Sequence, residues 1–186
     1  MKAAVVDLDS GELATARRRV DTPQPSTPEA MTEIVVELTR SYGWTGPIGC
    51  ALPTIVRSGV VESAANIDSS GIGVDANALF GEAIGQPVRT LNDADAAGLA
   101  EMRFGAGRGR AGVVLMLTFG TGIGSGLFTG GTLVPNTELG HLELDGAEAE
   151  SRAAASARKR EGLSWSEWAA RVQRYLRHVE RLFSPE

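Results

Sequence analysis

The sequence predicts an α/β fold, and three patterns in its 186 residues indicate that class. An apolar run at 87–91 ends in Asn92-Asp93 and passes directly into an Ala-rich stretch with helical character. Residues 112–118, GVVLMLT, form a continuous apolar run that favours a central strand covered on both faces. Residues 164–183 begin with a capping box and repeat apolar side chains at helical spacing, which predicts a long amphipathic helix.

The remaining elements follow from local signals along the chain. Residues 1–8 and 13–20 are separated by Asp9-Ser10-Gly11, whose turn chemistry predicts a β-hairpin. Cap and breaker residues predict a helix that is capped by Thr27 and stops at Gly43, and a second helix that is capped by Asp75 and stops at Gly85. Strands are expected at 47–52 and 60–61, between these helices, and at 87–91. A further helical segment is expected from Ala147 to Glu161. One apolar face of the last helix is expected to hold Trp165, Trp168, Ala169, Val172, Leu176, Val179 and Phe183.

The composition is that of a globular protein, with 42% hydrophobic and 22% charged residues. No apolar run approaches the roughly 18 residues that a membrane-spanning helix needs, and the first residues lack the apolar core of a signal peptide. The single cysteine, Cys50, cannot form an intramolecular disulfide, as expected in a reducing compartment. We therefore expect a cytoplasmic protein that does not interact with membranes.

Charge is distributed unevenly along the chain. The net charge is −5, from 18 basic and 23 acidic residues, but residues 151–186 hold eight basic and four acidic groups. The first 150 residues are therefore acidic, and we expect no nucleic-acid binding by this part. The last helix carries a basic stripe that consists of Arg171, Arg174, His178 and Arg181. Such a stripe is typical of a solvated helix face, and the alternative is a surface for a long polyanion.

The first candidate site is the glycine-rich sequence TFGTGIGSG at residues 118–126. Glycines at every second position let successive backbone N–H groups converge on one point, and threonine hydroxyls add donors, which suits phosphate oxygens. The spacing matches neither the P-loop nor the dinucleotide-binding motif. The alternative is a glycine-rich β-hairpin without a ligand, and we favour phosphate binding.

Carboxylates and one histidine supply the other candidates. Asp93 lies where a strand ends and a helix begins, so it either caps the helix or takes a proton from an attacking hydroxyl. Glu138 and His141 can bracket vicinal hydroxyls, because one accepts and the other donates hydrogen bonds. No cysteines follow to complete a zinc site, so no metal ligand is predicted here. Glu148 and Glu150 either supply a further acceptor or only cap and solvate a helix.

The chain resembles the ROK family of sugar kinases in three motifs, TFGTGIGSG, NDADAAGLAE and TELGH. It is similar to the polyphosphate glucokinase branch of that family, which lacks the Cys-rich zinc loop of many relatives, in TPQPSTP, GWTGP, AANID and LVPNTELGHLELDGAEAE. The resemblance implies an actin-like, ribonuclease-H-like fold with an N-terminal lobe at 1–91 and the start of a larger lobe at 92–186. The fold is expected to be incomplete at both ends. The first phosphate loop, DxGGTxxK, is not found, and residues 183–186 fall where the family continues into a strand and a glycine-rich donor-binding turn.

The resemblance also implies an activity and its residues. Members transfer a phosphoryl group from polyphosphate or ATP, with Mg²⁺, to the 6-hydroxyl of glucose, and Asp93 matches the base. The implied sugar contacts are Asn66, Asn92, Asp93, Glu138, His141 and Glu150, with Glu148 as the alternative to Glu150. The implied phosphate contacts are Thr118, Gly120, Thr121 and Gly122, and no structural zinc is expected. Thr54 stands where the family has glycine near the sugar, so added volume is expected there.

Other functions are weighed against the kinase. A non-catalytic sugar-binding or degenerate fragment of such a kinase is the second hypothesis, because the first donor loop is missing from the sequence. A sugar-responsive repressor is disfavoured, since no helix-turn-helix motif precedes the kinase-like part. The expected partners are glucose and the phosphoryl donor, and the helix at 165–183 leaves a homodimer open.

Overall fold

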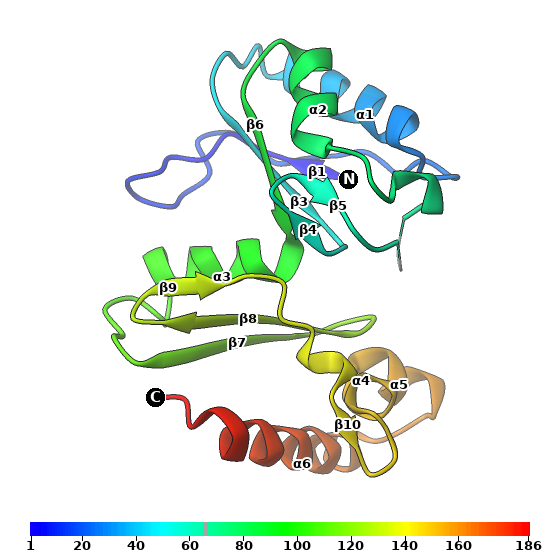
Figure 1. Cartoon of the computed structure of the whole chain (residues 1–186), viewed down its shortest axis with the longest axis vertical. Coiled ribbons are helices and arrows are strands. Elements are labelled where there is room, and N and C mark those ends of the chain that lie inside the picture. The colour runs from blue at the N-terminus through cyan, green and yellow to red at the C-terminus, as the bar shows by residue number, and fades with distance from the viewer. Residues whose placement is uncertain (65–66) are drawn as a thin grey trace. The chain divides into compact units, whose positions relative to one another are not determined.

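The computed structural model describes residues 1–64 and 67–186. The expected sugar contact Asn66 lies outside the described residues. The chain divides into two compact units, Met1–Asp93 and Ala94–Glu186, each of which is described by itself (Figure 1). In the described part of the chain, no helix is both long and apolar enough to cross a membrane.

The first unit contains a parallel pair of strands packed against two helices. β3 pairs with β6 in a register that ends with Leu52 opposite Asn92, so both strands end side by side. The elements of this unit are β1 (Lys2–Ala3), β2 (Arg18–Arg19), α1 (Pro28–Ser41), β3 (Ile48–Leu52), β4 (Val56–Arg57), β5 (Val60–Val61), the 3-10 helix η1 (Ser69–Gly71), α2 (Ala76–Ile84) and β6 (Val88–Asn92).

Local signals determine both helices of this unit. The Thr27 side chain caps α1 by accepting the Ala30 N–H at 3.3 Å, and Asp75 caps α2 by accepting the Ala78 N–H at 2.9 Å. Both expected helices and the three expected strands are confirmed. The helices and strands share one core, whose buried residues are Met31, Val35, Leu52, Val56, Val61, Ala76, Phe80 and Val88.

Two hairpins of the first unit differ from expectation. The N-terminal hairpin is confirmed, but β1 and β2 are only two residues each, with one further bridge between Val6 and Leu13. The sequence does not predict β4, which pairs with β5. The turn between them is formed by Ser58 and Gly59, both with positive φ, and a serine there is a weak turn signal.

The second unit contains an antiparallel sheet in the order β7-β8-β9, with α3 and α6 on opposite sides (Figure 1). Close packing of α3 on β8 depends on glycine, since a Cβ at Gly98 would lie 2.8 Å from the Phe128 ring. The elements are α3 (Asp93–Phe104, its first residue assigned to the first unit), β7 (Val113–Phe119), β8 (Ile123–Thr129), β9 (Thr132–Val134), the 3-10 helix η2 (Leu139–His141), β10 (Glu143–Leu144), β11 (Ala147–Glu148), α4 (Ala149–Ala153), α5 (Ala155–Arg160) and α6 (Trp165–Phe183).

The expectation of a central strand at 112–118 is wrong for the described part of the chain. β7 lies at the end of the strand order, and its apolar side chains are only half-buried. Leu115, Leu117 and Phe119 pack against the core cluster that includes α6. Because α3 and α6 lie on opposite sides of this sheet (Figure 1), the continuous apolar run agrees with the expected coverage of both faces, although β7 is not central.

The expectation of one helix from Ala147 to Glu161 is also wrong. The segment begins as β11, and α4 and α5 are separated at Ala154, whose backbone is extended, with φ −62° and ψ 157°. The Trp168 indole N–H donates to the carbonyls of Ala153 at 2.9 Å and Ala154 at 3.2 Å. A side chain from α6 thus stabilises the break, and local sequence does not show such a contact.

The last helix is confirmed as α6, and its capping box between Ser164 and Glu167 is complete. Its apolar face is narrower than expected, since Trp165 is 69% exposed and Leu176 is 39% exposed. Tyr175, which is missing from the expected face, is completely buried. The face that packs on the sheet is therefore centred on a residue that the periodicity did not indicate.

Candidate functional site

The glycine-rich sequence forms the turn of the β7–β8 hairpin. Phe119 pairs with Ile123, and the Gly120 N–H donates to the Gly122 carbonyl at 2.9 Å. The backbone therefore has the hairpin conformation that was the alternative to a dedicated phosphate loop. Thr118, Gly120 and Thr121 are exposed, so the turn is accessible to a ligand, and phosphate binding there stays a prediction.

The start of α5 holds this turn from one side. The Ser156 N–H donates to the Gly120 carbonyl at 3.0 Å, and the Ser156 hydroxyl donates to the Thr121 carbonyl at 2.6 Å. Two consecutive carbonyls of the turn are thereby bound by one residue. The turn is therefore bound to the start of α5.

Glu150, on α4, lies between the turn and η2. Its Oε2 accepts the Ile123 N–H at 3.0 Å. A Cβ at Gly122 would lie 2.4 Å from this oxygen, and a Cβ at Gly140 would lie 2.8 Å from it. Glycine is needed at both positions because the carboxylate approaches the backbone so closely. One carboxylate thus connects the glycine turn to the segment that carries His141.

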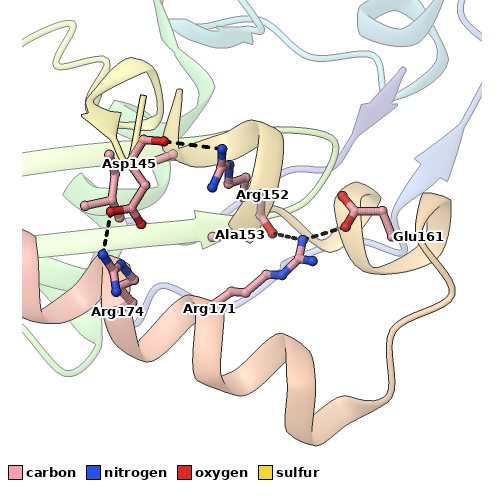
Figure 2. A pocket seen from close by; sticks show the side chains of 8 residues that line it. Asp145, Arg152, Ala153, Glu161, Arg171 and Arg174 are labelled. Atoms are coloured by element: carbon pink, nitrogen blue, oxygen red, sulfur yellow. Dashed lines mark hydrogen bonds and ion pairs between the residues drawn. The ribbon is translucent and has the colours of Figure 1, made fainter. Parts of the chain in front are cut away.

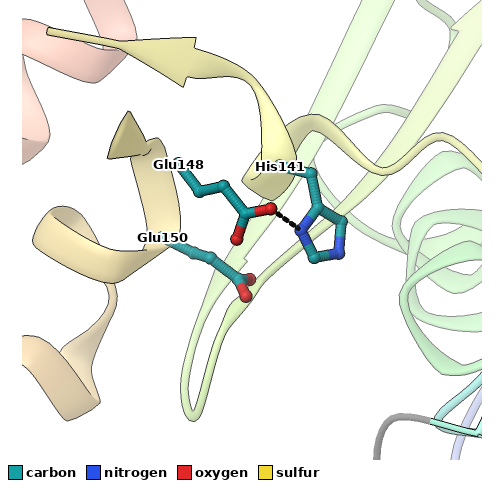
Figure 3. A group of neighbouring side chains, drawn as sticks. All are labelled: His141, Glu148 and Glu150. Carbon is teal, nitrogen blue, oxygen red and sulfur yellow. Dashed lines mark ion pairs between the residues drawn. The ribbon is translucent and has the colours of Figure 1, made fainter. Parts of the chain in front are cut away.

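His141, Glu148 and Glu150 form a cluster (Figure 3). His141 Nδ1 lies 3.3 Å from a Glu148 carboxylate oxygen, and one ligand atom from each residue lies within 4.8 Å of the others. Such a set can hold a cation, and its atoms can equally donate and accept hydrogen bonds with sugar hydroxyls. The structure therefore brings together His141 and both alternatives, Glu148 and Glu150.

Two buried polar residues hold the segment that carries Glu138. The Leu139 N–H donates to the Ser125 hydroxyl at 3.2 Å, and that hydroxyl donates to the Thr137 carbonyl at 2.5 Å. Asp95, on α3, accepts the Asn136 N–H at 2.8 Å. Ser125 and Asp95 are each 1% exposed. Sequence reasoning missed both as site residues, although Asp95 lies only two positions after Asp93.

Tyr175 supports the same segment from α6. Its hydroxyl donates to the Leu139 carbonyl at 3.2 Å, and its ring meets the Phe119 ring edge-on, with the centroids 6.1 Å apart. Burial raises the pKa of Tyr175 to about 12, and the negative charge of Glu150 adds to this effect. The tyrosine therefore stays neutral and links η2 to the end of β7 beside the glycine turn.

The remaining expected site residues belong to the first unit. Asn92 is buried at the end of β6, and its side-chain amide donates to the Thr54 carbonyl at 3.2 Å. Asp93 is the exposed first residue of α3. The Thr54 hydroxyl is buried and bonds to Ser63, so its extra volume is accommodated inside this unit.

Comparison with known proteins connects this geometry to a family. The sequence model of the ROK family matches residues 1–159. The polyphosphate glucokinase of Mycobacterium tuberculosis (strain CDC 1551 / Oshkosh) is 48% identical over 187 residues, which cover 100% of this chain and 71% of that protein. The structure of inorganic polyphosphate/ATP-glucomannokinase from Arthrobacter sp. strain KM matches with a TM-score of 0.93 and 51% identity, over 100% of this chain and 76% of that chain.

A third match comes from a structure with ligands. The ROK family glucokinase from Streptomyces griseus, in complex with glucose and AMPPNP, matches with a TM-score of 0.74 and 28% identity, over 86% of this chain and 55% of that chain. Together the matches define the class as the actin-like α/β fold of sugar kinases, of which this chain covers a part. The chain belongs to the ROK family. The predicted family and fold class are confirmed.

Proposed function

We propose that this chain acts as a glucokinase that transfers a phosphoryl group from polyphosphate or ATP to the 6-hydroxyl of glucose. The polyphosphate glucokinase and the polyphosphate/ATP-glucomannokinase match over the whole chain at 48% and 51% identity. The observation that carries the proposal is the position of Glu150, which contacts the glycine turn and belongs to the His141 cluster. Phosphoryl transfer to a sugar needs a phosphate-binding turn held beside hydroxyl-binding groups.

On the acceptor side, carboxylates accept hydrogen bonds from sugar hydroxyls, and the imidazole donates one. The rigid mounting of Glu138 and His141 through Ser125 and Tyr175 supports this role, because binding groups must be held in position before the substrate arrives. The residues assigned to glucose are Asn66, Asn92, Asp93, Glu138, His141 and Glu150, with Glu148 as the alternative to Glu150.

On the donor side, the glycine turn binds the phosphoryl group in transit. The assigned residues are Thr118, Gly120, Thr121 and Gly122. The hydroxyls of Thr118 and Thr121 and the backbone N–H groups of Thr121 and Gly122 stabilise the charge on its oxygens. Gly120, whose N–H donates to the Gly122 carbonyl, adds no side chain that would block the approach. Asp93 takes the proton from the 6-hydroxyl while the sugar oxygen attacks phosphorus, and the bond from phosphorus to the bridging oxygen of the donor breaks.

Mg²⁺ accompanies the donor phosphates in this proposal. Mg²⁺ prefers oxygen ligands in octahedral geometry. The cluster of His141, Glu148 and Glu150 includes an imidazole nitrogen, so it fits sugar hydroxyls better than Mg²⁺. We therefore assign no Mg²⁺ ligand on this chain and no catalytic step to the ion. The proposed setting is the cytoplasm, which agrees with the single cysteine, Cys50.

Turnover and sugar binding are measured separately on the purified protein. Glucose 6-phosphate formation is followed with polyphosphate and with ATP in the presence of Mg²⁺, and glucose binding is followed by titration calorimetry. The proposal expects turnover with at least one donor. Glucose binding without turnover supports the second hypothesis, a non-catalytic sugar-binding fragment. This hypothesis is tested because the chain spans 71% of the length of its M. tuberculosis relative. The absence of both contradicts both functions.

A further inference from the structure

The second unit contains a cavity of about 330 Å³ that the proposed reaction does not use. It lies between the β10–β11 hairpin and the helices α4 and α6, with Glu161, which follows α5, at its edge (Figure 2). Its charged lining residues are Asp145, Arg152, Glu161, Arg171 and Arg174. A volume of this size is within the usual range for ligand sites, which begins at about 300 Å³.

The three arginines of the cavity contact its two acidic residues and its backbone. Arg171 pairs with Glu161 at 2.7 Å and donates to the Arg152 carbonyl at 3.3 Å. Arg174 pairs with the Asp145 carboxylate, and Arg152 donates to the Asp145 carbonyl at 3.3 Å. Each guanidinium has five N–H donors, so these contacts leave most donors available for a further acceptor.

The charge of the cavity favours an anion. Three guanidinium groups face two carboxylates, and residues 151–186 as a whole hold eight basic and four acidic groups. The ion pairs are partly exposed, since the Arg174 side chain is 65% exposed and the Arg171 side chain is 35% exposed. Exposed pairs of this kind contribute little to stability, so a phosphate can share or replace the carboxylates. Guanidinium groups bind phosphate in bidentate geometry, with two parallel N–H···O hydrogen bonds.

One short segment connects the cavity to the glycine turn. Ala153 lines the cavity, and Ser156, three residues later, binds the carbonyls of Gly120 and Thr121. Both features therefore belong to one part of the second unit. A donor with a long chain of phosphates can extend past the turn, whereas ATP ends in a nucleoside.

We propose that Arg152, Arg171 and Arg174 bind phosphate groups of an inorganic polyphosphate chain other than the group being transferred. The inference rests on the proposed function and names the donor class for which this surface is suited. Of the basic stripe expected from the sequence, Arg171 and Arg174 line the cavity, whereas His178 and Arg181 are not among its lining residues. Arg152 from α4 is the third arginine of the lining.

The test uses the purified chain and long-chain polyphosphate as the probe. Arg152→Gln and the double variant Arg152→Gln/Arg174→Gln are compared with Arg177→Gln, which changes the same charge at an exposed residue of α6 outside the cavity. Polyphosphate affinity is measured directly, without glucose, at low and high salt. KM values for polyphosphate and ATP are measured in the kinase assay.

We expect the double variant to bind long-chain polyphosphate roughly tenfold more weakly, because charge-assisted hydrogen bonds are lost. The effect should shrink with tripolyphosphate and at high salt, and the KM for ATP and the affinity for glucose should stay unchanged. Equal polyphosphate affinity in the double variant and Arg177→Gln overturns the proposal. A parallel loss for polyphosphate and ATP does the same.

Folding is checked by circular dichroism and melting temperature. If the double variant does not fold, Arg152→Gln decides the question. Arg152 is exposed, its guanidinium contacts the Asp145 carbonyl, and the substitution leaves the backbone carbonyl that Arg171 binds. Unchanged polyphosphate affinity in that single variant contradicts the proposal. Polyphosphate binding that depends on these arginines, without any glucose phosphorylation, refutes the proposed function and leaves this inference standing.

Discussion

Two glycine turns of the β7-β8-β9 sheet look alike in the sequence but differ in their surroundings. The outer turn, between β8 and β9, holds Gly130 and Gly131, with φ of 57° and 78°, and a Cβ at either position would have nothing within 4 Å. The inner turn is the one between β7 and β8. At the turn between β7 and β8, by contrast, a Cβ at Gly122 would lie 2.4 Å from the Glu150 carboxylate. Glycine serves backbone conformation in the first case and close approach of a carboxylate in the second.

The difference supports the proposal that the turn between β7 and β8 is the phosphate site. At Gly130 and Gly131 no neighbour lies within 4 Å of a Cβ, so glycine in the outer turn is explained by its positive φ. Contacts from Glu150 and Ser156 fix the inner turn at its backbone, as a preorganised phosphate site requires. Glycine content alone therefore does not distinguish the two turns.

The largest effect is expected at Asp93, because a substitution there removes the proposed base and leaves the contacts that hold the inner turn unchanged. Asp93→Asn keeps the shape of the side chain but removes the proton acceptor. We expect turnover to fall by about 100-fold to 10,000-fold, the usual contribution of a general base, while glucose affinity is retained. Steady-state kinetics and calorimetry measure the two quantities. Asp21→Asn, at another exposed position, is the control, and near-normal turnover of Asp93→Asn removes the residue from the base role.

The next effect compares the two turns directly. In Gly122→Ala the new methyl group collides with the end of the Glu150 side chain, which can move but then loses its bond to the Ile123 N–H. We expect a folded protein with turnover reduced on the order of 10- to 100-fold, because the turn is displaced. Gly130→Ala should cost about 1 kcal/mol of stability through its positive φ and leave turnover unchanged. Equal turnover in the two variants contradicts the comparison.

A smaller effect distinguishes the two glutamates of the His141 cluster. Glu150→Gln keeps an oxygen that can accept the Ile123 N–H, but it removes the charge offered to a sugar hydroxyl. We expect the KM for glucose to rise about tenfold, in line with the loss of a hydrogen bond to a charged group. Glu148→Gln is the matched variant. A larger rise for Glu148→Gln would assign the second sugar-binding glutamate to residue 148 instead.

Local signals in the sequence predict much of the fold. Thr27 and Asp75 each cap a helix by a bond to an N–H three residues away, and Asn92-Asp93 mark a strand end and a helix start. The Glu138 and His141 segment also follows from a short motif. These features involve neighbours along the chain, so one sequence is enough to find them.

The supporting contacts of the site could not be predicted in the same way. Tyr175 reaches Leu139 across 36 residues, Asp95 reaches Asn136 across 41, and Glu150 reaches Ile123 across 27. The break at Ala154 likewise depends on Trp168, which lies on another helix. Each contact is set by tertiary packing, to which helical periodicity and motif spacing are not sensitive.

The smallest effect is expected at Tyr175, which supports the inner turn and η2 from α6. Tyr175→Phe removes the hydrogen bond to the Leu139 carbonyl and leaves the ring packed on Phe119. We expect a loss of about 1 kcal/mol in unfolding free energy and a modest rise in the KM for glucose. Urea unfolding measures the first and steady-state kinetics the second. Tyr42→Phe is the control for the KM: it removes a hydroxyl that is bonded to the backbone of Ala3, Ala16 and Arg18, so it should lower stability and leave the KM for glucose unchanged.

The pH dependence gives this last prediction a signature of its own. The pKa of Tyr175 is about 12 in the folded chain, against an ordinary value of 10.0, so between these pH values only the unfolded state loses the phenol proton. The unfolded state then binds fewer protons than the folded state, and the unfolding free energy falls as pH rises through this window. Tyr175→Phe lacks this proton, so its unfolding free energy should fall less steeply above pH 10 than that of the unmodified chain. Equal slopes in the two proteins would mean that the phenol is not held neutral by its burial beside Glu150.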